Sequence, residues 1–170
     1  AEDLRIDYSI LDQHADSYRK IRNTFRYLLG NLNDNIEDIN LEKLNLKNLP
    51  EIEQFMLHKI FQLDKKFKKY FQAYDFHNLY KELLNFCTVD LSAFYFDIRK
   101  DCLYCDPKNS TKRKSVILLL NVILNSLLRW FAPILSFTTE EINKLLKVNK
   151  SIHLESFTNY PINFVNEELN

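Results

Sequence analysis

The sequence predicts an all-α fold, an up-and-down helical bundle of four long helices with a short fifth helix and an irregular C-terminal tail. Only one glycine and four prolines interrupt 170 residues, whereas strand-rich folds need many turn glycines. Apolar side chains recur at spacings of three and four, which is the period of a helix face. Short connections at two of the three joints favour antiparallel neighbours. We expect one domain over residues 1–170, with the bundle at about 9–148 and an extended tail at 149–170.

The first helix is expected from about Ser9 to Gly30. Ser9 suits the N-cap position, and Gly30 suits a C-terminal cap because glycine tolerates a positive φ. One face of this helix is apolar and predicts core positions at Tyr18, Ile21, Phe25, Leu28, Leu29 and Leu32. The asparagine-rich residues 31–49 predict a connector that forms at most a short helical turn.

Pro50 suits the opening of a second helix that runs to about Ala73. Its predicted core positions are Ile52, Met56, Ile60, Leu63, Phe67, Phe71 and Tyr74. Asp75 suits the cap of a third helix that reaches about Lys100. The core positions predicted for that helix are Leu79, Leu83, Phe86, Phe94 and Ile98.

Ser110 can cap a fourth helix, which Pro133 disrupts at its end. Residues 116–131 are apolar over most of the helix circumference. A helix that is apolar on all sides must be covered by its neighbours. The fourth helix is therefore predicted to be the centre of the bundle.

A short fifth helix is expected at residues 138–148, because Thr138 and Glu141 have the spacing of a capping box. Beyond it, residues 151–157 are expected to be extended and residues 159–170 to form a polar tail.

Charge and composition exclude several classes of protein. Lys plus Arg and Asp plus Glu both count 23, so the formal net charge is zero. A local basic face remains possible, because a phosphate senses charges only within a Debye length of ~8–10 Å. A single glycine excludes phosphate-cradling loops. No apolar run approaches the ~18 residues of a membrane span, and there is no signal-peptide pattern. We expect a soluble, cytoplasmic protein that does not bind membranes.

Residues able to perform catalysis or bind metal are present but are not grouped. Cys102 and Cys105 form a C-x-x-C pair, which is half of a zinc site or a redox pair. The chain has no second paired motif, so thiols at a helix end are the favoured interpretation. The four histidines are dispersed, and no nucleophile-elbow glycines exist. We predict no metal site and no catalytic residue.

A cationic arc is predicted on the first helix, opposite its apolar face. Arg19, Arg22, Asn23 and Arg26 fall within roughly 100° of each other around the helix axis, with no acidic residue among them. Guanidinium groups match phosphate oxygens, and an asparagine can hydrogen-bond a base edge or a ribose. From these residues alone, a solvated helix face is the more common meaning of such a run.

Two further basic clusters have alternative interpretations. Lys108, Lys112, Arg113 and Lys114 lie in a loop and at a helix start, where backbone N–H groups also face an anion. Phosphate contact and simple solvation both stay open for them. The four lysines between residues 65 and 69 flank Phe67, a pattern typical of single-strand binding. A core stripe with a solvated lysine face is the favoured interpretation there.

Three segments resemble one protein family in the expected order. They are YRKIRNTFRYLLGNL at 18–32, YDFHNLYKELLNFCTVDLSAFYFDIRKDCLYCD at 74–106 and LLRWFAPILSFTTEEI at 127–142. Together they resemble the anticodon-binding domain of class I aminoacyl-tRNA synthetases, and the isoleucyl branch in particular, over residues 3–157. The chain departs from the family where Glu53, Gln54 and Phe55 replace Asp-Arg-Trp, where Cys102 replaces arginine and where Asn143 replaces tryptophan.

The resemblance implies a domain that binds the anticodon stem and loop of isoleucine-specific tRNA. The tRNA contacts expected from it and from the basic clusters are Arg19, Arg22, Asn23, Arg26, Arg129, Trp130, Lys112 and Arg113. The family's His-Ile-Gly-His and Lys-Met-Ser-Lys-Ser signatures are absent, so we expect a monomeric fragment without cofactors of its own. The parent ligase would use ATP with Mg, and zinc in a missing C-terminal segment. A protein-interaction bundle and a general RNA-binding module are the alternatives.

Overall fold

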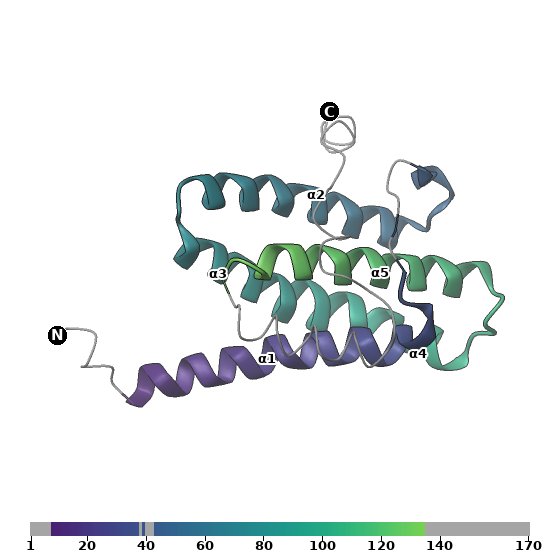
Figure 1. Cartoon of the computed structure of the whole chain (residues 1–170). Helices are drawn as coiled ribbons and strands as arrows, with labels where there is room; N and C mark the ends of the chain where they lie inside the picture. The colour runs from purple at the N-terminus through teal and green to yellow at the C-terminus, as the bar shows by residue number, and fades with distance from the viewer. Residues whose placement is uncertain (1–7, 38, 40–42, 135–170) are drawn as a thin grey trace.

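The computed structural model describes residues 8–37, 39 and 43–134 and is shown in Figure 1. This part of the chain contains helices and no strand. The helices are α1 (Tyr8–Leu32), α2 (Glu51–Gln72), α3 (Phe76–Asn85), η5 (Phe86–Phe96), α4 (Asp97–Cys105) and α5 (Thr111–Phe131), with short turns at η2 (Asn33–Asn35) and η4 (Leu46–Asn48). Since α3, η5 and α4 are continuous, four long helical segments form the bundle, as predicted. The fifth helix expected at 138–148 and the tail lie outside the described residues.

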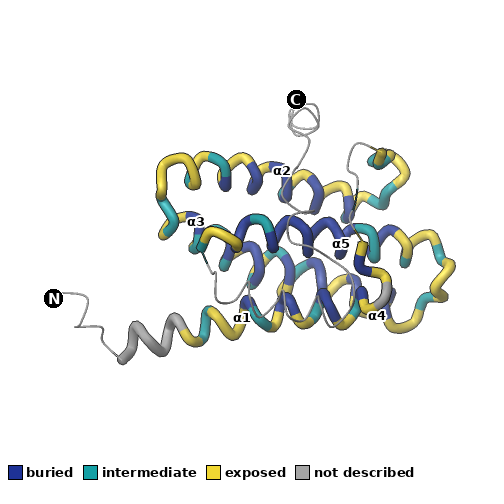
Figure 2. Tube along the Cα trace, viewed as in Figure 1, coloured by how far each residue is buried: buried dark blue, intermediate teal, exposed yellow. Residues whose placement is uncertain are grey.

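Consecutive segments run in opposite directions, which confirms the up-and-down arrangement (Figure 1). Helix α5 lies between α1 and α2 and also contacts α3 and α4. Figure 2 shows that α5 is buried along most of its length. The prediction of a central fourth helix is therefore confirmed.

By length and composition, α5 is apolar enough to cross a membrane, with a mean hydropathy of 1.4 over its most apolar window. The sequence expectation that no run approaches this length is wrong for α5. However, 78% of that window is buried inside the bundle. Packing against the other helices thus covers the surface that a membrane would otherwise cover.

Asn121 is a buried polar residue in the middle of α5 and fixes the connector that follows α1. Its side-chain Nδ2 donates to the carbonyl of Asn35 at 3.0 Å, and its Oδ1 accepts from the backbone N–H of Glu37 at 2.9 Å. Both hydrogen bonds satisfy polar groups that are costly to bury alone. The chain leaving α1 is thereby held against the central helix.

Helix α1 buries the apolar face that the sequence predicts, except that Tyr18 is 37% exposed. Gly30 does not end the helix, which continues to Leu32, and Gly30 has no positive φ. Asn33 adopts the left-handed conformation instead, with a φ of 46°. Asparagine tolerates this conformation better than most residues. Because Leu32 is fully buried, core packing extends the helix past its glycine.

Helix α2 ends in a Schellman motif. The N–H of Asp75 donates to the carbonyl of Tyr70 at 2.9 Å, and the N–H of Tyr74 donates to the carbonyl of Phe71 at 3.1 Å. Phe71 is 45% exposed and Tyr74 is 79% exposed, so their prediction as core positions is wrong. Tyr74 lies past the end of α2, where the helical period no longer applies, and Phe71 lies in the last turn of the helix. Asp75 caps α3 as predicted, accepting from the N–H of Asn78 at 3.3 Å.

The third long segment reaches Cys105, five residues past its predicted end. Its middle section η5 is an eleven-residue π-helix. A π-turn is wider than an α-turn and changes the register of every later residue. As a result Ile98, a predicted core position, is 42% exposed, while Arg99 is buried.

Arg99 forms a buried, bidentate ion pair with Glu53 that joins α4 to α2. Arg99 Nη2 donates to Glu53 Oε1 at 2.8 Å, and Arg99 Nε donates to Glu53 Oε2 at 3.1 Å. Burial, together with the neighbouring Glu53 charge, holds the pKa of Tyr95 well above its usual value. Glu53 was noted in the sequence only as a departure from the family pattern. In the structure it supplies the buried carboxylate.

Removing one partner of this buried pair will destabilise the fold strongly. We expect Glu53→Ala to lower the free energy of unfolding by about 3–5 kcal/mol, because it leaves a buried charge without its partner. The control is Glu82→Ala, which removes an exposed ion pair with Lys66 and should cost at most about 1 kcal/mol. Urea denaturation measures both, and equal losses would contradict the assignment.

Gly30→Ala will stabilise the protein. Gly30 is inside α1, and a Cβ added there meets no atom within 4 Å. Alanine loses less backbone entropy in a helix, so the free energy of unfolding should rise by about 0.5–1 kcal/mol. Thermal and urea denaturation check this result. Destabilisation would show that Gly30 is needed for a conformation only glycine adopts.

Candidate nucleic-acid interface

The cationic arc predicted on the first helix lies on the outer face of α1. Arg19, Asn23 and Arg26 are exposed and Arg22 is half-buried. The opposite face is fixed in the core by side chains such as Ile21 and Phe25. The structure therefore brings these four residues together on one rigid surface, which we call the α1 basic face.

Asp16 modifies the α1 basic face at its N-terminal end. Its carboxylate forms ion pairs with Arg19 and with Lys20, the latter at 3.1 Å. The hydrogen bond from Lys20 and the charges of Lys20 and Arg19 lower the pKa of Asp16. Sequence reasoning counted no acid within the arc and missed this partner one turn earlier. The surface around Arg22, Asn23 and Arg26 lies farther from Asp16 along the helix.

Arg22 and Arg26 are four residues apart, so their side chains emerge as neighbours on the helix, with Cβ atoms about 5–6 Å apart. Asn23 lies beside them with an amide that both donates and accepts hydrogen bonds. Two guanidinium forks and one amide can bind phosphate oxygens and a base edge at the same time. This arrangement suits the binding of a nucleic acid.

Lys112 and Arg113 lie at the start of α5, where Lys112 is exposed and Arg113 is half-buried. Ser110 caps this end as predicted, with its Oγ accepting from the N–H of Arg113 at 3.0 Å. The ring of Phe25 contacts that of Phe131 at the other end of α5, with centroids 6.0 Å apart. Arg113 and Phe131 are 18 positions apart on α5, or about 27 Å. The structure therefore does not join this cluster to the α1 basic face.

Arg129 and Trp130 lie inside the bundle around the carboxylate of Asp64. Trp130 is fully buried, and its Nε1 donates to Asp64 Oδ1 at 2.9 Å. Arg129 also pairs with Asp64, and its guanidinium lies 5.3 Å from the ring centre of Phe67. Arg129 and Trp130 are predicted from the sequence as tRNA contacts. This geometry does not support that prediction, because both side chains point into the bundle. We leave them out of the interface.

Sequence reasoning missed Asp64 and Glu53, which are both fully buried. Each is an acidic residue within a turn of core positions on α2. An acid on the apolar side of an amphipathic helix is rarely buried unless it is paired. The place of each acid among the core positions of α2 was therefore the sequence signal that its carboxylate pairs with a buried cation or hydrogen-bond donor.

The cysteines occupy separate environments. Cys102 is buried and its Sγ donates to Asp106 Oδ2 at 3.2 Å, whereas Cys105 is exposed. Burial raises the pKa of the Cys87 thiol to about 12. Among residues 8–37, 39 and 43–134, no group of three or more His, Cys, Asp or Glu side chains is placed to hold a metal ion.

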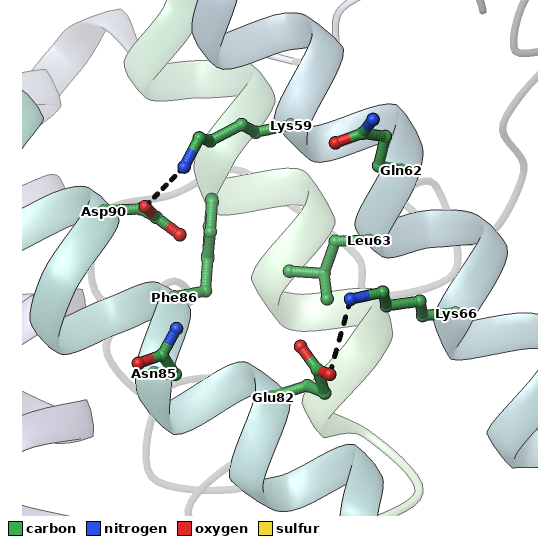
Figure 3. Close-up of a pocket in the computed structure, with 8 residues that line it drawn as sticks. All are labelled: Lys59, Gln62, Leu63, Lys66, Glu82, Asn85, Phe86 and Asp90. Carbon is green, nitrogen blue, oxygen red and sulfur yellow. Dashed lines mark hydrogen bonds and ion pairs between the residues drawn. The ribbon is translucent and has the colours of Figure 1, made fainter.

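A groove of about 180 Å³ lies between α2 and the α3–η5 segment (Figure 3). Its lysines are bonded to its carboxylates: Lys59 to Asp90 at 2.8 Å and Lys66 to Glu82 at 3.4 Å. The charges at this groove are therefore compensated within the protein. The lining residues are Lys59, Gln62, Leu63, Lys66, Glu82, Asn85, Phe86 and Asp90.

Residues 53–170 match the sequence model of a family described as the anticodon-binding domain of tRNA ligase. The chain belongs to this family. Among its relatives, isoleucine–tRNA ligase of Pelagibacter ubique is 72% identical over 170 residues, which is 99% of the chain and 19% of that protein. The isoleucine–tRNA ligases of Persephonella marina and Mesorhizobium japonicum are 43% and 40% identical, over 99% of the chain and 18% and 17% of those proteins.

The relatives named above are much longer proteins than this chain. The chain spans about a fifth of the length of the curated relatives it matches. The similarity to these relatives includes α1, which precedes the region matched by the family. The α1 basic face therefore lies within the region aligned with these relatives and precedes the residues matched by the family model.

The burial of Trp130 has a direct optical test, because it is the only tryptophan in the chain. We expect a blue-shifted emission that acrylamide quenches weakly, since the indole is fully buried and bonded to Asp64. Added tRNA should leave this emission unchanged. The urea-unfolded chain is the control and should be quenched strongly. Quenching of the folded chain by tRNA would return Trp130 to the interface.

Proposed function

We propose that this chain binds the anticodon stem and loop of an isoleucine-specific tRNA, as part of an isoleucine–tRNA ligase. The observation that carries the proposal is the family match over 53–170 joined to relatives of that name across the whole chain. The α1 basic face supports it physically, because a helix fixed by the core carries the exposed Arg19 and Arg26 and the half-buried Arg22 on its outer face.

In this proposal Arg22 and Arg26 bind phosphates, which sets the position of the RNA without reading its sequence. Asn23 lies beside them and contacts a base edge or a ribose hydroxyl. The anticodon loop suits such a surface, because its unstacked bases offer edges and faces that a duplex hides. Lys112 and Arg113, at the far end of α5, contact a separate part of the same RNA.

The chain's proposed contribution to ligation is binding and placement. Contacts far from the reacting groups hold a substrate in position and supply binding energy for catalysis elsewhere. We assign the joining of isoleucine to tRNA, with ATP, to other parts of the whole protein. The proposal includes a monomeric protein in the cytoplasm.

The test is the affinity for isoleucine tRNA of Arg22→Ala and Arg26→Ala. Each substitution should weaken binding about tenfold or more, because hydrogen bonds to charged groups contribute about 1.5–3 kcal/mol. Each should also reduce the slope of log affinity against log salt by about 1. Filter binding across a salt series measures both quantities.

The matched control is Lys47→Ala, since Lys47 is exposed and lies on η4, away from α1. It should change neither affinity nor slope. A transcript with a substituted anticodon tests whether the bases are read. Unchanged affinity and slope for both arginine variants would defeat the proposal.

A further inference from the structure

The turn between α2 and α3 places a tyrosine where glycine is usual. Tyr74 occupies the left-handed position of the Schellman motif, with a φ of 54°. Glycine is the common residue at this position because it has no Cβ to clash. The Tyr74 ring is also 79% exposed, so burial does not offset the backbone strain. Strain that the fold does not need is found most often at binding sites.

The exposed tyrosine ends a continuous series of aromatic rings, which we call the aromatic cluster (Phe67, Phe71, Phe76 and Tyr74). Ring centroids lie 5.7 Å apart for Phe67 and Phe71, 6.2 Å for Phe71 and Phe76, and 6.2 Å for Phe76 and Tyr74. Phe67 is buried against the core and the Arg129 guanidinium. The cluster is thus rigid at its inner end and opens to solvent at its outer end.

The surroundings of the aromatic cluster are basic. Residues 65–78 contain four lysines and one aspartate. That aspartate, Asp75, is occupied by the N–H and the Nδ2 of Asn78, at 3.3 and 2.7 Å. Lys66 and Lys68 pair with carboxylates, whereas the part of the chain that the structure describes gives Lys65 and Lys69 no ion pair. The local charge therefore favours an anionic partner.

We propose that Tyr74 and Phe71 stack an unpaired base of the bound RNA, while the positive charge of Lys65 and Lys69 favours the approach of its phosphate backbone. This inference rests on the proposed function and adds a second contact surface to it. Stacking on aromatic faces accepts any base. Lys65 and Lys69 emerge on the face of α2 opposite Phe67 and Phe71, so their charge attracts the RNA to this end of the helix without contacting the stacked base. The α2–α3 turn lies at the end of the bundle where α1 begins (Figure 1). Arg22 and Arg26 lie 14 and 18 residues from that end of α1, or about 21 and 27 Å, so an RNA that contacts both surfaces extends over at least that length.

The experiment uses the full-length protein and isoleucine tRNA transcripts that carry 2-aminopurine singly at each unpaired position of the anticodon loop. Stacking quenches this base, so one position should lose fluorescence on binding. Tyr74→Gly should abolish that quenching and weaken binding about 5- to 100-fold. It should also raise Tm by a few degrees, because glycine removes the strained φ.

Two variants act as controls. Tyr74→Phe keeps the ring and should keep both quenching and affinity. Tyr104→Leu removes an equally exposed tyrosine, which is 82% exposed on α4, and should change neither quenching nor affinity. A loss of affinity in Tyr104→Leu equal to that in Tyr74→Gly would overturn the assignment, because any exposed ring would then have the same effect.

Wild-type affinity in Tyr74→Gly would also overturn the inference. The proposed function would stand in that case if Arg26→Ala still weakened tRNA binding, and both would fail if Arg26→Ala bound normally. A lower Tm in Tyr74→Gly would overturn the stacking inference too. The Tyr74 ring would then be packed against another part of the protein and would not be available to stack on a base.

Discussion

The bundle depends on the need to cover α5, which is apolar around most of its circumference. Helices α1, α2, α3 and α4 all contact α5. Because α1 is committed to α5 through residues such as Phe25 and Leu28, its opposite face is left to solvent with its arginines. The position of the α1 basic face is thus a consequence of core packing. Asp64 on α2 and Asn121 on α5 are two of the polar residues buried at this helix, and both have hydrogen-bond partners.

The sequence predicts the helices well wherever one regular period continues. The apolar faces of α1 and α5 and the caps at Asp75 and Ser110 follow from local chemistry. Local chemistry fails where the backbone leaves the α period. At Gly30, packing of Leu32 extends the helix past a residue that could have ended it. At η5, a π-helix changes the register, and neither composition nor spacing in residues 86–96 indicates it.

The residues of the candidate site likewise fall into two groups: those whose position follows from local spacing and those whose position depends on a distant partner. Arg22, Asn23 and Arg26 share a face because of their spacing alone, so sequence could predict their grouping. The inward position of Arg129 and Trp130 depends on Asp64, which is 66 residues from Trp130. Such a partner is supplied by the tertiary fold and cannot be read from neighbouring residues. The exposure of Tyr74 likewise depends on a left-handed backbone that its side chain disfavours.

The π-helix makes the length of the third helical segment critical. If one residue were deleted from η5 and α-type bonding were restored, α4 would rotate by about 100° relative to α3. Arg99 would leave α2, and the carboxylate of Glu53 would be stranded in the core. Insertions and deletions within residues 86–96 should therefore be rejected more strongly than many substitutions there, since a shortened segment fits neither register.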